Sequence, residues 1–347
     1  MRTSITPLEL HFKRPAGTSR GIMQVKNSWV LKLIDNGIVG TGEISIIEGL
    51  SPEFTDIYRF EIKIEEVRRQ LENGNWSLAY GYEIASTLNQ FPSIKFGLES
   101  ALLDLKNGGK GMLFINDFSN GIRKLPINGL VWMGDEVFMK EQIAQKLYEG
   151  YTTIKMKVGA IDFNTELKLL ASIRQQYPAN QITLRVDANG GFTPHQAIHI
   201  LKELADLEIH SIEQPIKAGQ WHEMSELCKS TPLPIALDEE LIGINELSRK
   251  AEMLDKIQPQ FIILKPSLHG GISGTQEWIE LAEQKNIPWW MTSALESNIG
   301  LSAICQLAAE YQNELPQGLG TGALYTNNIE SDLIVEKGYI RREIRNS

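Results

Sequence analysis

The sequence has little cysteine. Only Cys228 and Cys305 occur among its 347 residues, far apart and without the close spacing of a zinc or redox motif. A disulfide framework and a cysteine-rich zinc site are therefore excluded. Because unpaired cysteines are typical of a reducing compartment, we expect the protein to be cytoplasmic.

Long apolar runs and an excess of basic residues are also absent. No stretch approaches the roughly 20 apolar residues of a membrane-spanning helix, and residues 1–7 lack the apolar core of a secretory signal. The formal net charge is -9, and no cluster of Lys and Arg stands out against it. We therefore expect neither a membrane nor a nucleic-acid partner, and any anionic substrate needs a local positive site.

Residues 1–124 are predicted to form an α+β domain, with strands first and helices after them. Strand-like alternation over residues 8–47 includes a hairpin turn at Asp35-Asn36-Gly37. The segment Arg14 to Gly21 is rich in small residues, and we expect an exposed turn there in preference to a mobile flap. From residue 54 to about residue 111 the apolar periodicity is helical.

Residues 125–323 repeat a strand, a loop and a helix at intervals of roughly 25 to 30 residues, which is typical of a closed parallel barrel. The strand candidates are 127–132, 152–158, 182–186, 209–212, 233–237, 261–264, 287–291 and 317–321. An open doubly wound sheet is the alternative. However, the glycine-rich segment 318–322 comes at the end of the repeats, whereas a dinucleotide loop follows a first strand. Residues 324–347 are expected to pack back on the first domain.

The stretch Thr153 to Gly159 alternates charged and apolar side chains. Lys155 and Lys157 are two residues apart and would project from the same face of a strand. Two adjacent ammonium groups repel each other, so this face needs solvent, carboxylates or an anionic ligand.

Charged residues also stand where the following barrel strands end. Ends of neighbouring barrel strands meet at one mouth, where barrel active sites lie. Any one of these residues could be an ordinary surface charge, but their recurrence in consecutive units favours a site. They are Asp187, Glu213, Asp238 and Lys265.

Three carboxylates without His or Cys favour a hard cation such as Mg²⁺ over zinc. A cation that binds a substrate carboxylate makes the neighbouring C–H more acidic, and an amine with a lowered pKa can then remove that proton. The sequence therefore predicts proton abstraction α to a carboxylate of a small molecule, through an enediolate.

The motifs Lys-Met-Lys, Asp-Ala-Asn, Glu-Gln-Pro, Asp-Glu and Lys-Pro-Ser resemble those of the enolase superfamily, in its muconate-cycloisomerase-like subgroup. The resemblance covers essentially the whole chain. It implies a modified TIM barrel, (β/α)7β, with an N-terminal α+β capping domain.

The same resemblance implies a role for each site residue. The implied roles are Lys157 as acid and base, Lys155 as its support, Lys265 opposite them across the substrate, and Asp187, Glu213 and Asp238 as ligands of Mg²⁺, for which Mn²⁺ can substitute. Beside these ligands, Asn189, Gln214 and Glu239 are expected to orient them from an outer shell.

The last two barrel units discriminate between reactions of this subgroup. The segment Met291 to Leu301 resembles the Glu-Ser-x-x-Gly-Leu region of o-succinylbenzoate synthases, and Gly-Leu-x-Thr at 318–321 resembles their Gly-Leu-Asp-Thr, with Gly320 in place of Asp. Dipeptide epimerases carry Asp-x-Asp there to receive an ammonium group. Because 318–322 contains no carboxylate, a substrate without an amine is favoured.

The resemblance thus implies a synthase that dehydrates 2-succinyl-6-hydroxy-2,4-cyclohexadiene-1-carboxylate in menaquinone biosynthesis. An N-acylamino-acid racemase or dipeptide epimerase on the same scaffold is the alternative, and a non-catalytic binding protein is a third hypothesis. The residues expected to contact the substrate are Thr292, Ser293, Gly320 and, by its position in the 14–21 segment, Arg20. The oligomeric state stays open.

Overall fold

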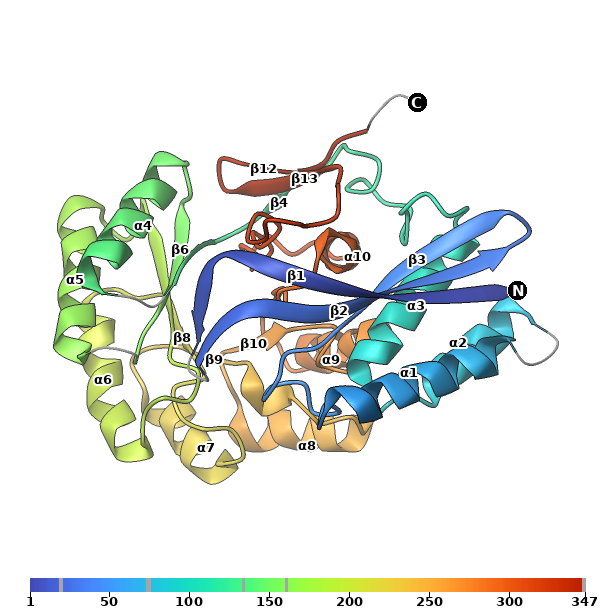
Figure 1. Ribbon diagram of the computed structural model, residues 1–347. Coiled ribbons are helices and arrows are strands. Elements are labelled where there is room, and N and C mark those ends of the chain that lie inside the picture. Colours follow the sequence, from blue (N-terminus) through green and yellow to red (C-terminus); the bar gives the residue numbers. More distant parts are fainter. Residues whose placement is uncertain (19–20, 73–75, 133–134, 160–161, 345–347) are drawn as a thin grey trace.

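The computed structural model describes residues 1–18, 21–72, 76–132, 135–159 and 162–344 (Figure 1). Its helices and strands, in chain order, are β1 (Arg2–Thr18), β2 (Gly21–Asp35), β3 (Ile38–Ser45), α1 (Ile57–Glu72), α2 (Leu78–Ser86), α3 (Pro92–Lys106), β4 (Leu125–Pro126), β5 (Gly129–Val131), α4 (Glu136–Tyr148), β6 (Thr153–Lys157), α5 (Phe163–Gln176), β7 (Thr183–Asp187), α6 (Pro194–Asp206), β8 (Ser211–Glu213), α7 (Trp221–Ser230), β9 (Ile235–Leu237), η1 (Glu239–Leu241), α8 (Leu247–Ile257), β10 (Phe261–Leu264), α9 (Gly271–Gln284), β11 (Trp289–Met291), α10 (Asn298–Ala309), β12 (Leu333–Glu336) and β13 (Tyr339–Arg342).

The first part of the chain is an antiparallel sheet, β1-β2-β3, followed by three helices. Asn36 and Gly37 both have positive φ, and Asp35 pairs with Ile38 across them. This geometry matches the two-residue turns that follow the twist of paired strands, so the predicted hairpin is confirmed.

The prediction of an exposed turn from Arg14 to Gly21 is wrong over most of its length. Pairing between β1 and β2 continues to Thr18 and Gly21, after a register shift between His11 and Ala16. Small residues do not prevent a strand from pairing when its backbone N–H and C=O groups can bond to a neighbouring strand. In Figure 1 the two strands extend from the helices toward the barrel strands.

Strand β3 approaches helix α3 very closely. A Cβ added at Gly42 would lie 1.9 Å from the carbonyl oxygen of Gly97. Because backbone blocks this position, the strand and helix would have to separate. We expect Gly42→Ala to lower the free energy of unfolding by at least about 3 kcal/mol, the upper end of common overpacking costs, measured by urea denaturation.

A matched control for this substitution is Gly243→Ala. A Cβ there meets nothing within 4 Å, although φ is +80°. We expect it to cost only about 1 kcal/mol, the strain of a left-handed alanine. Equal losses from Gly42→Ala and Gly243→Ala would contradict the close-packing argument.

The second part of the chain is a parallel barrel. Within the described residues its sheet has seven strands in the order β11-β10-β9-β8-β7-β6-β5. The expected eighth strand consists of two parallel bridges, Thr292 to Gly318 on one side and Ile127 to Gln317 on the other. These bridges join the two edges of the sheet, and the predicted (β/α)7β barrel with its α+β cap is confirmed.

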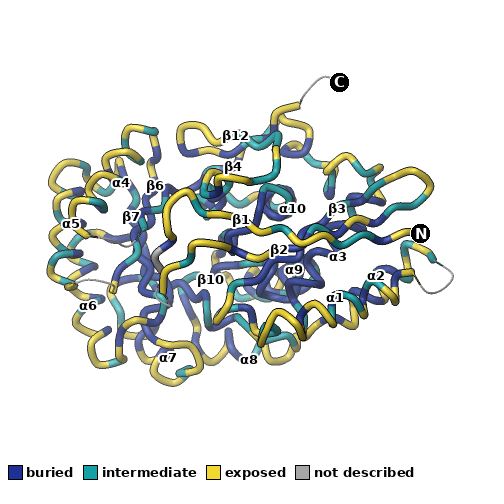
Figure 2. Tube along the Cα trace, viewed as in Figure 1, coloured by how far each residue is buried: buried dark blue, intermediate teal, exposed yellow. Residues whose placement is uncertain are grey.

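The barrel helices are fixed by their ends and by one apolar side. Helix α6, for example, begins with a capping box between Thr193 and Gln196, followed by Pro194 at the first turn. Figure 2 shows the barrel strands buried and the outward faces of α4 to α8 exposed. The buried apolar residues between strands and helices form the largest core of the molecule.

The last residues contact both parts of the chain. Strand β12 pairs with β13, and β13 pairs with β4. Phe12 of β1 bridges to Tyr325. The division at residues 124 and 125 stays a prediction. Within the described ranges, no helix combines the length and apolar character needed to cross a membrane.

Candidate active site

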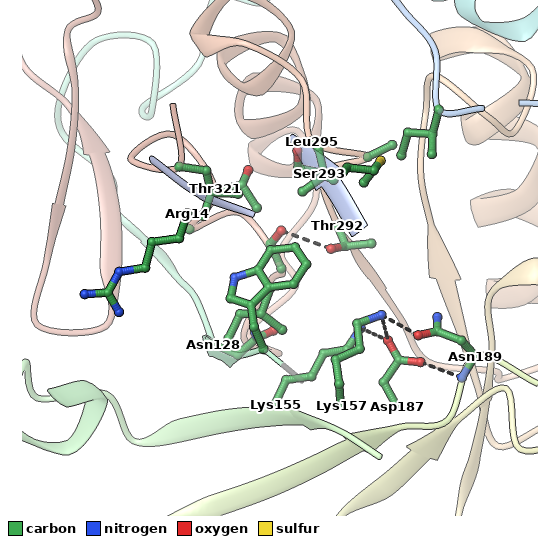
Figure 3. A pocket seen from close by; sticks show the side chains of 18 of the residues that line it. Arg14, Asn128, Lys155, Lys157, Asp187, Asn189, Thr292, Ser293, Leu295 and Thr321 are labelled. Carbon is green, nitrogen blue, oxygen red and sulfur yellow. Dashed lines mark hydrogen bonds and ion pairs between the residues drawn. The ribbon is translucent and has the colours of Figure 1, made fainter. Parts of the chain in front are cut away.

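A cavity of about 1120 Å³ lies where the barrel strands end and the capping sheet passes over them (Figure 3). Cap residues such as Arg14 and Leu50 form one wall, and barrel residues form the other. The predicted residues that line it are Lys155, Lys157, Asp187, Asn189, Glu239, Lys265, Thr292, Ser293 and Gly320.

Lys155 and Lys157 of β6 both point toward the carboxylate of Asp187 at the end of β7, as the alternation predicts. Register pairs Lys157 directly with Asp187. The distances from Nζ to Asp187 Oδ2 are 2.8 Å for Lys155 and 2.7 Å for Lys157. The repulsion between the two ammonium groups is thus offset by a shared buried carboxylate.

The other two predicted ligands lie deeper than the cavity wall. Glu213 ends β8 and contacts the Lys155 amine, and Asp238 follows β9 and contacts the Lys265 amine. Both carboxylates are fully or almost fully buried. Three carboxylates on neighbouring strands therefore lie between lysines on the strands at either end, and each buried charge needs its partner.

Neighbouring carboxylates raise the pKa of Lys155 and of Lys265. Burial alone would lower the pKa of Lys155, but Asp187 and Glu213 together raise it, and Asp238 does the same for Lys265 against its burial. Each of these two amines has a carboxylate in contact, and that charge outweighs the effect of burial.

The carboxylates shift in different directions. Burial tends to raise the pKa of Asp187, but Lys155 and Lys157 lower it well below its usual range. The pKa of Glu213 is raised, because burial and the neighbouring charge of Asp187 outweigh the opposite effect of Lys155. Three acids this close therefore need cations around them to stay ionised together.

The three predicted ligands, Asp187, Glu213 and Asp238, offer the type of donor atom that a hard cation binds. Glu213 Oε1 and Asp238 Oδ1 are buried and have no hydrogen-bond partner, and oxygen donors are what Mg²⁺ prefers. In the described part of the chain, however, no group of three or more His, Cys, Asp or Glu side chains is arranged so that it could hold a metal ion. The lysines contact the other oxygen of each carboxylate, Glu213 Oε2 and Asp238 Oδ2, so the two unpartnered oxygens are the ones that a cation would use.

The expected outer-shell residues form two different sets of contacts. Asn189 accepts from Lys157 at 2.6 Å and donates to Glu239 at 3.0 Å. Gln214 is buried below the cavity, and its Oε1 accepts from the backbone N–H groups of Asp238 and Glu240. Asn189 therefore orients the cavity side of the site, whereas Gln214 fixes the chain that carries Asp238.

The expected substrate contacts lie on the opposite wall. Thr292 donates to the carbonyl of Gly318 at 3.0 Å, and Ser293 donates to Glu296 at 2.6 Å. A Cβ at Gly320 would make only ordinary contacts, the nearest at 3.5 Å, so sterics do not require glycine there. Arg20 lies outside the described residues.

Arg14 and Asn128 are among the polar residues of the cavity wall that the sequence analysis did not assign to the site. Arg14 comes from β1 of the cap, and Asn128 precedes β5. Both are labelled in Figure 3. Asn128 could have been found as the polar residue at the start of the first barrel strand. Arg14 could not, because only the three-dimensional structure brings the cap over this mouth.

Comparison with known proteins identifies the group to which this site belongs. Residues 139–343, more than half of the chain, match the family described as Enolase C-terminal domain-like. The chain belongs to this family. The resemblance to the enolase superfamily inferred from the motifs is thereby confirmed.

Relatives of this enolase-like chain include enzymes with different activities. It is 48% identical to o-succinylbenzoate synthase of Desulfotalea psychrophila, over 98% of each chain, and 26% identical to L-Ala-D/L-Glu epimerase of Bacillus subtilis, over 90% of this chain and 86% of the relative.

Solved structures agree with the enolase-like fold. The crystal structure of MenC from Desulfotalea psychrophila is 43% identical and superposes with a TM-score of 0.88, covering 98% of this chain and 99% of that one. A dipeptide epimerase from Cytophaga hutchinsonii, solved with Mg and D-Ala-L-Val, is 22% identical with a TM-score of 0.84, covering 98% and 92%. The second likeness concerns the fold alone.

Proposed function

We propose that this chain is an o-succinylbenzoate synthase, a carbon–oxygen lyase that removes water from 2-succinyl-6-hydroxy-2,4-cyclohexadiene-1-carboxylate. The observation that carries the proposal is the full-length similarity to the Desulfotalea psychrophila synthase. The site supports it with lysines on two sides of one cavity: three strands lie between β6, which carries Lys157, and β10, which precedes Lys265.

Lys157 is the residue best suited to move the proton. Its amine lines the cavity, and its side chain is 14% exposed. Lys155 lies between two carboxylates that hold its proton. A general base must reach the substrate and exchange its own proton, so Lys157 acts and Lys155 supports the shared Asp187 carboxylate.

Lys265 faces the reacting ring from the other side. Negative charge that develops on the substrate when the C–H bond breaks spreads into the ring, and a fixed ammonium group stabilises that charge. Asp187, Glu213 and Asp238 would hold Mg²⁺, whose positive charge would make the C–H bond next to the substrate carboxylate more acidic.

One acid–base residue is enough for both proton transfers of the reaction. Lys157 takes the proton from the carbon next to the carboxylate, the C–O bond to the ring hydroxyl breaks, and a ring double bond forms. Lys157 then returns the proton to the departing hydroxide, which leaves as water. Because the product ring is aromatic, the elimination is strongly favoured.

The direct test follows the ultraviolet absorbance of the cyclohexadiene substrate as the purified protein converts it to o-succinylbenzoate. Rapid turnover with Mg²⁺ that stops on addition of EDTA, and returns with excess Mg²⁺, supports the synthase. A folded protein that binds Mg²⁺ and gives no turnover refutes it.

A dipeptide epimerase is the second candidate, and the relatives include one. Residues 318–322 contain no carboxylate to receive an ammonium group, and an ammonium without a partner in this cavity costs several kcal/mol. We expect kcat/KM for L-Ala-L-Glu to be at least about 10³-fold below that for the cyclohexadiene, the factor that such a cost produces.

This expectation is measured by deuterium exchange at the α-carbon of L-Ala-L-Glu in D₂O. N-succinylamino acids, which lack the free amine, serve as the matched comparison. Exchange with the dipeptide as fast as turnover of the cyclohexadiene would contradict the argument from the missing carboxylate.

A further inference from the structure

A second group of buried charges lies behind the wall of the cavity, where the capping sheet meets the barrel. It contains Lys26 of β2, Glu43 of β3 and Glu296 of the turn between β11 and α10. Both carboxylates are completely buried, and Lys26 is 3% exposed. None of the three lines the cavity, and the proposed mechanism uses none of them.

Glu296 ties together two loops of the active site. One of its oxygens accepts from the hydroxyl of Ser267 at 2.5 Å, and the other accepts from the hydroxyl of Ser293 at 2.6 Å. Ser267 follows Lys265 by two residues, and Ser293 is part of the cavity wall. The carboxylate therefore holds the loop that carries the ring-facing lysine against the loop that forms the opposite wall.

The hydroxyl of Ser293 has a defined orientation as a result. Its proton points to Glu296, and its oxygen accepts the backbone N–H of Glu296 at 3.3 Å. A serine whose proton is already donated offers the cavity only an acceptor. The buried carboxylate thus sets which kind of group Ser293 can receive from a ligand.

Glu43 reaches the same place from the capping domain. Its carboxylate accepts from Ser297 N–H at 2.9 Å, from the Ser297 hydroxyl at 2.5 Å and from Gly300 N–H at 2.9 Å. It therefore occupies the N-terminus of α10, where N–H groups and the helix dipole stabilise an anion.

The side chains of Glu43 and Glu296 both pack against Gly300. A Cβ at Gly300 would be 2.7 Å from Glu296 Cβ and 2.9 Å from Glu43 Oε2. Two like charges this near each other in a dry interior need a cation. Lys26 supplies the cation: its amine contacts Ser45, two residues after Glu43 on the same strand. Burial lowers the pKa of this lysine, and the charges of Glu296 and then Glu43 act against that effect.

The donors at the start of α10 already stabilise the charge of Glu43. The positive charge of Lys26 therefore contributes most to the stability of the Glu296 carboxylate. Glu43 has three donors at the start of α10, whereas Glu296 has two serine hydroxyls. Removal of Lys26 would leave Glu296 as a buried charge with neutral donors only. Movement of the Glu296 carboxylate toward water would lower the free-energy cost of burying that charge. Such a movement would carry Ser293 and Ser267 with it.

We propose that Glu296 is a positioning residue of the active site, and that Lys26 of the capping domain holds it in place by balancing its charge. The capping domain thereby sets the arrangement of the Ser293 wall and of the loop after Lys265. The kinetic part of this inference rests on the proposed synthase function, whereas the structural part does not.

Three variants test the charge balance: Lys26→Met, Glu296→Gln and the double variant. A displacement of about 1 Å in an active site costs about 10²-fold in rate, so each single variant should lose about that much kcat/KM. The double variant removes both charges, and we expect it to recover at least about tenfold over Lys26→Met. A purely structural pair would change the melting temperature without this pattern in kcat and KM.

Glu99→Gln is the matched control. Glu99 of the capping domain is also buried, and it accepts from Ile272 N–H at 2.6 Å and from the Ser273 hydroxyl at 2.6 Å, at the start of α9. It makes the same kind of contact between cap and barrel but does not touch Ser293. We expect Glu99→Gln to lower the melting temperature and to leave kcat within about twofold of the wild type.

Hydrogen–deuterium exchange of the full chain separates the two proposals. Amides of residues 292–300 should exchange faster in Lys26→Met and return toward wild-type rates in the double variant. If the wild type fails to convert the cyclohexadiene, the synthase proposal is wrong, and the exchange data still judge the network. Unchanged exchange in residues 292–300, or a double variant no better than Lys26→Met, would overturn the inference.

Discussion

Lys157→Met should lower kcat by about 10³-fold or more, within the range that general acid–base groups contribute. The variant removes the amine that reaches the cavity, whereas Lys155 and Glu213 keep their contact. Steady-state kinetics with the cyclohexadiene substrate measures the loss. Because KM reports mainly binding when chemistry is slow, we expect it to change much less than kcat.

Lys157→Arg separates the charge of this residue from its proton transfer. Arginine keeps a cation beside Asp187 but stays protonated at any practical pH. The Arg variant should therefore be nearly as inactive as the Met variant. Lys140→Met, which removes an exposed lysine paired with Glu136 on α4, should keep full activity. An Arg variant with substantial activity would exclude Lys157 as the base.

Asp238→Asn should lower kcat/KM by at least about 10³-fold, since the charge stabilisation provided by a catalytic cation amounts to several kcal/mol. Asp238 Oδ1 is buried and has no hydrogen-bond partner, so it is available to a cation. An amide at this position removes the charge and half of the oxygen donors. Calorimetric titration with Mg²⁺ should show an affinity at least tenfold weaker.

Asp255→Asn is the matched control for this substitution. Asp255 makes an ion pair with Lys285 on the surface, away from the cavity, and exposed pairs contribute little. We expect its Mg²⁺ affinity and turnover to equal those of the wild type. Wild-type Mg²⁺ affinity in Asp238→Asn would remove Asp238 from the proposed ligand set.

Local patterns were enough to predict the centre of the site. Alternation from Thr153 to Gly159 put Lys155 and Lys157 on one face, and both contact Asp187. Barrel geometry then brought the strand ends at Glu213, Asp238 and Lys265 together, because every parallel strand ends at the same mouth. These predictions needed only the period of a strand and the repeat of the barrel.

Other features depend on contacts that no local pattern contains. Glu43 and Ser297 are 254 positions apart in the chain, and they meet only when the capping sheet packs against the start of α10. The eighth strand, expected over residues 317–321, is reduced to bridges at Gln317 and Gly318, since a closing segment needs only enough backbone to join two edges. The direction of the lysine pKa shifts likewise depends on which carboxylates come within contact.

The pairing of β1 with the turn after the barrel has a consequence for the order of folding. The backbone N–H of His11 donates to Asn327, 316 positions later, and Lys13 N–H donates to the carbonyl of Leu324. During synthesis the β1–β2 hairpin can form as soon as residues 1–35 have left the ribosome. The free edge of β1, however, can bind its partner residues 324–327 only after almost the whole chain has been made. Distant contacts slow folding. We therefore expect the contact between β1 and residues 324–327, which completes the capping sheet over the cavity, to form last, after the barrel has closed.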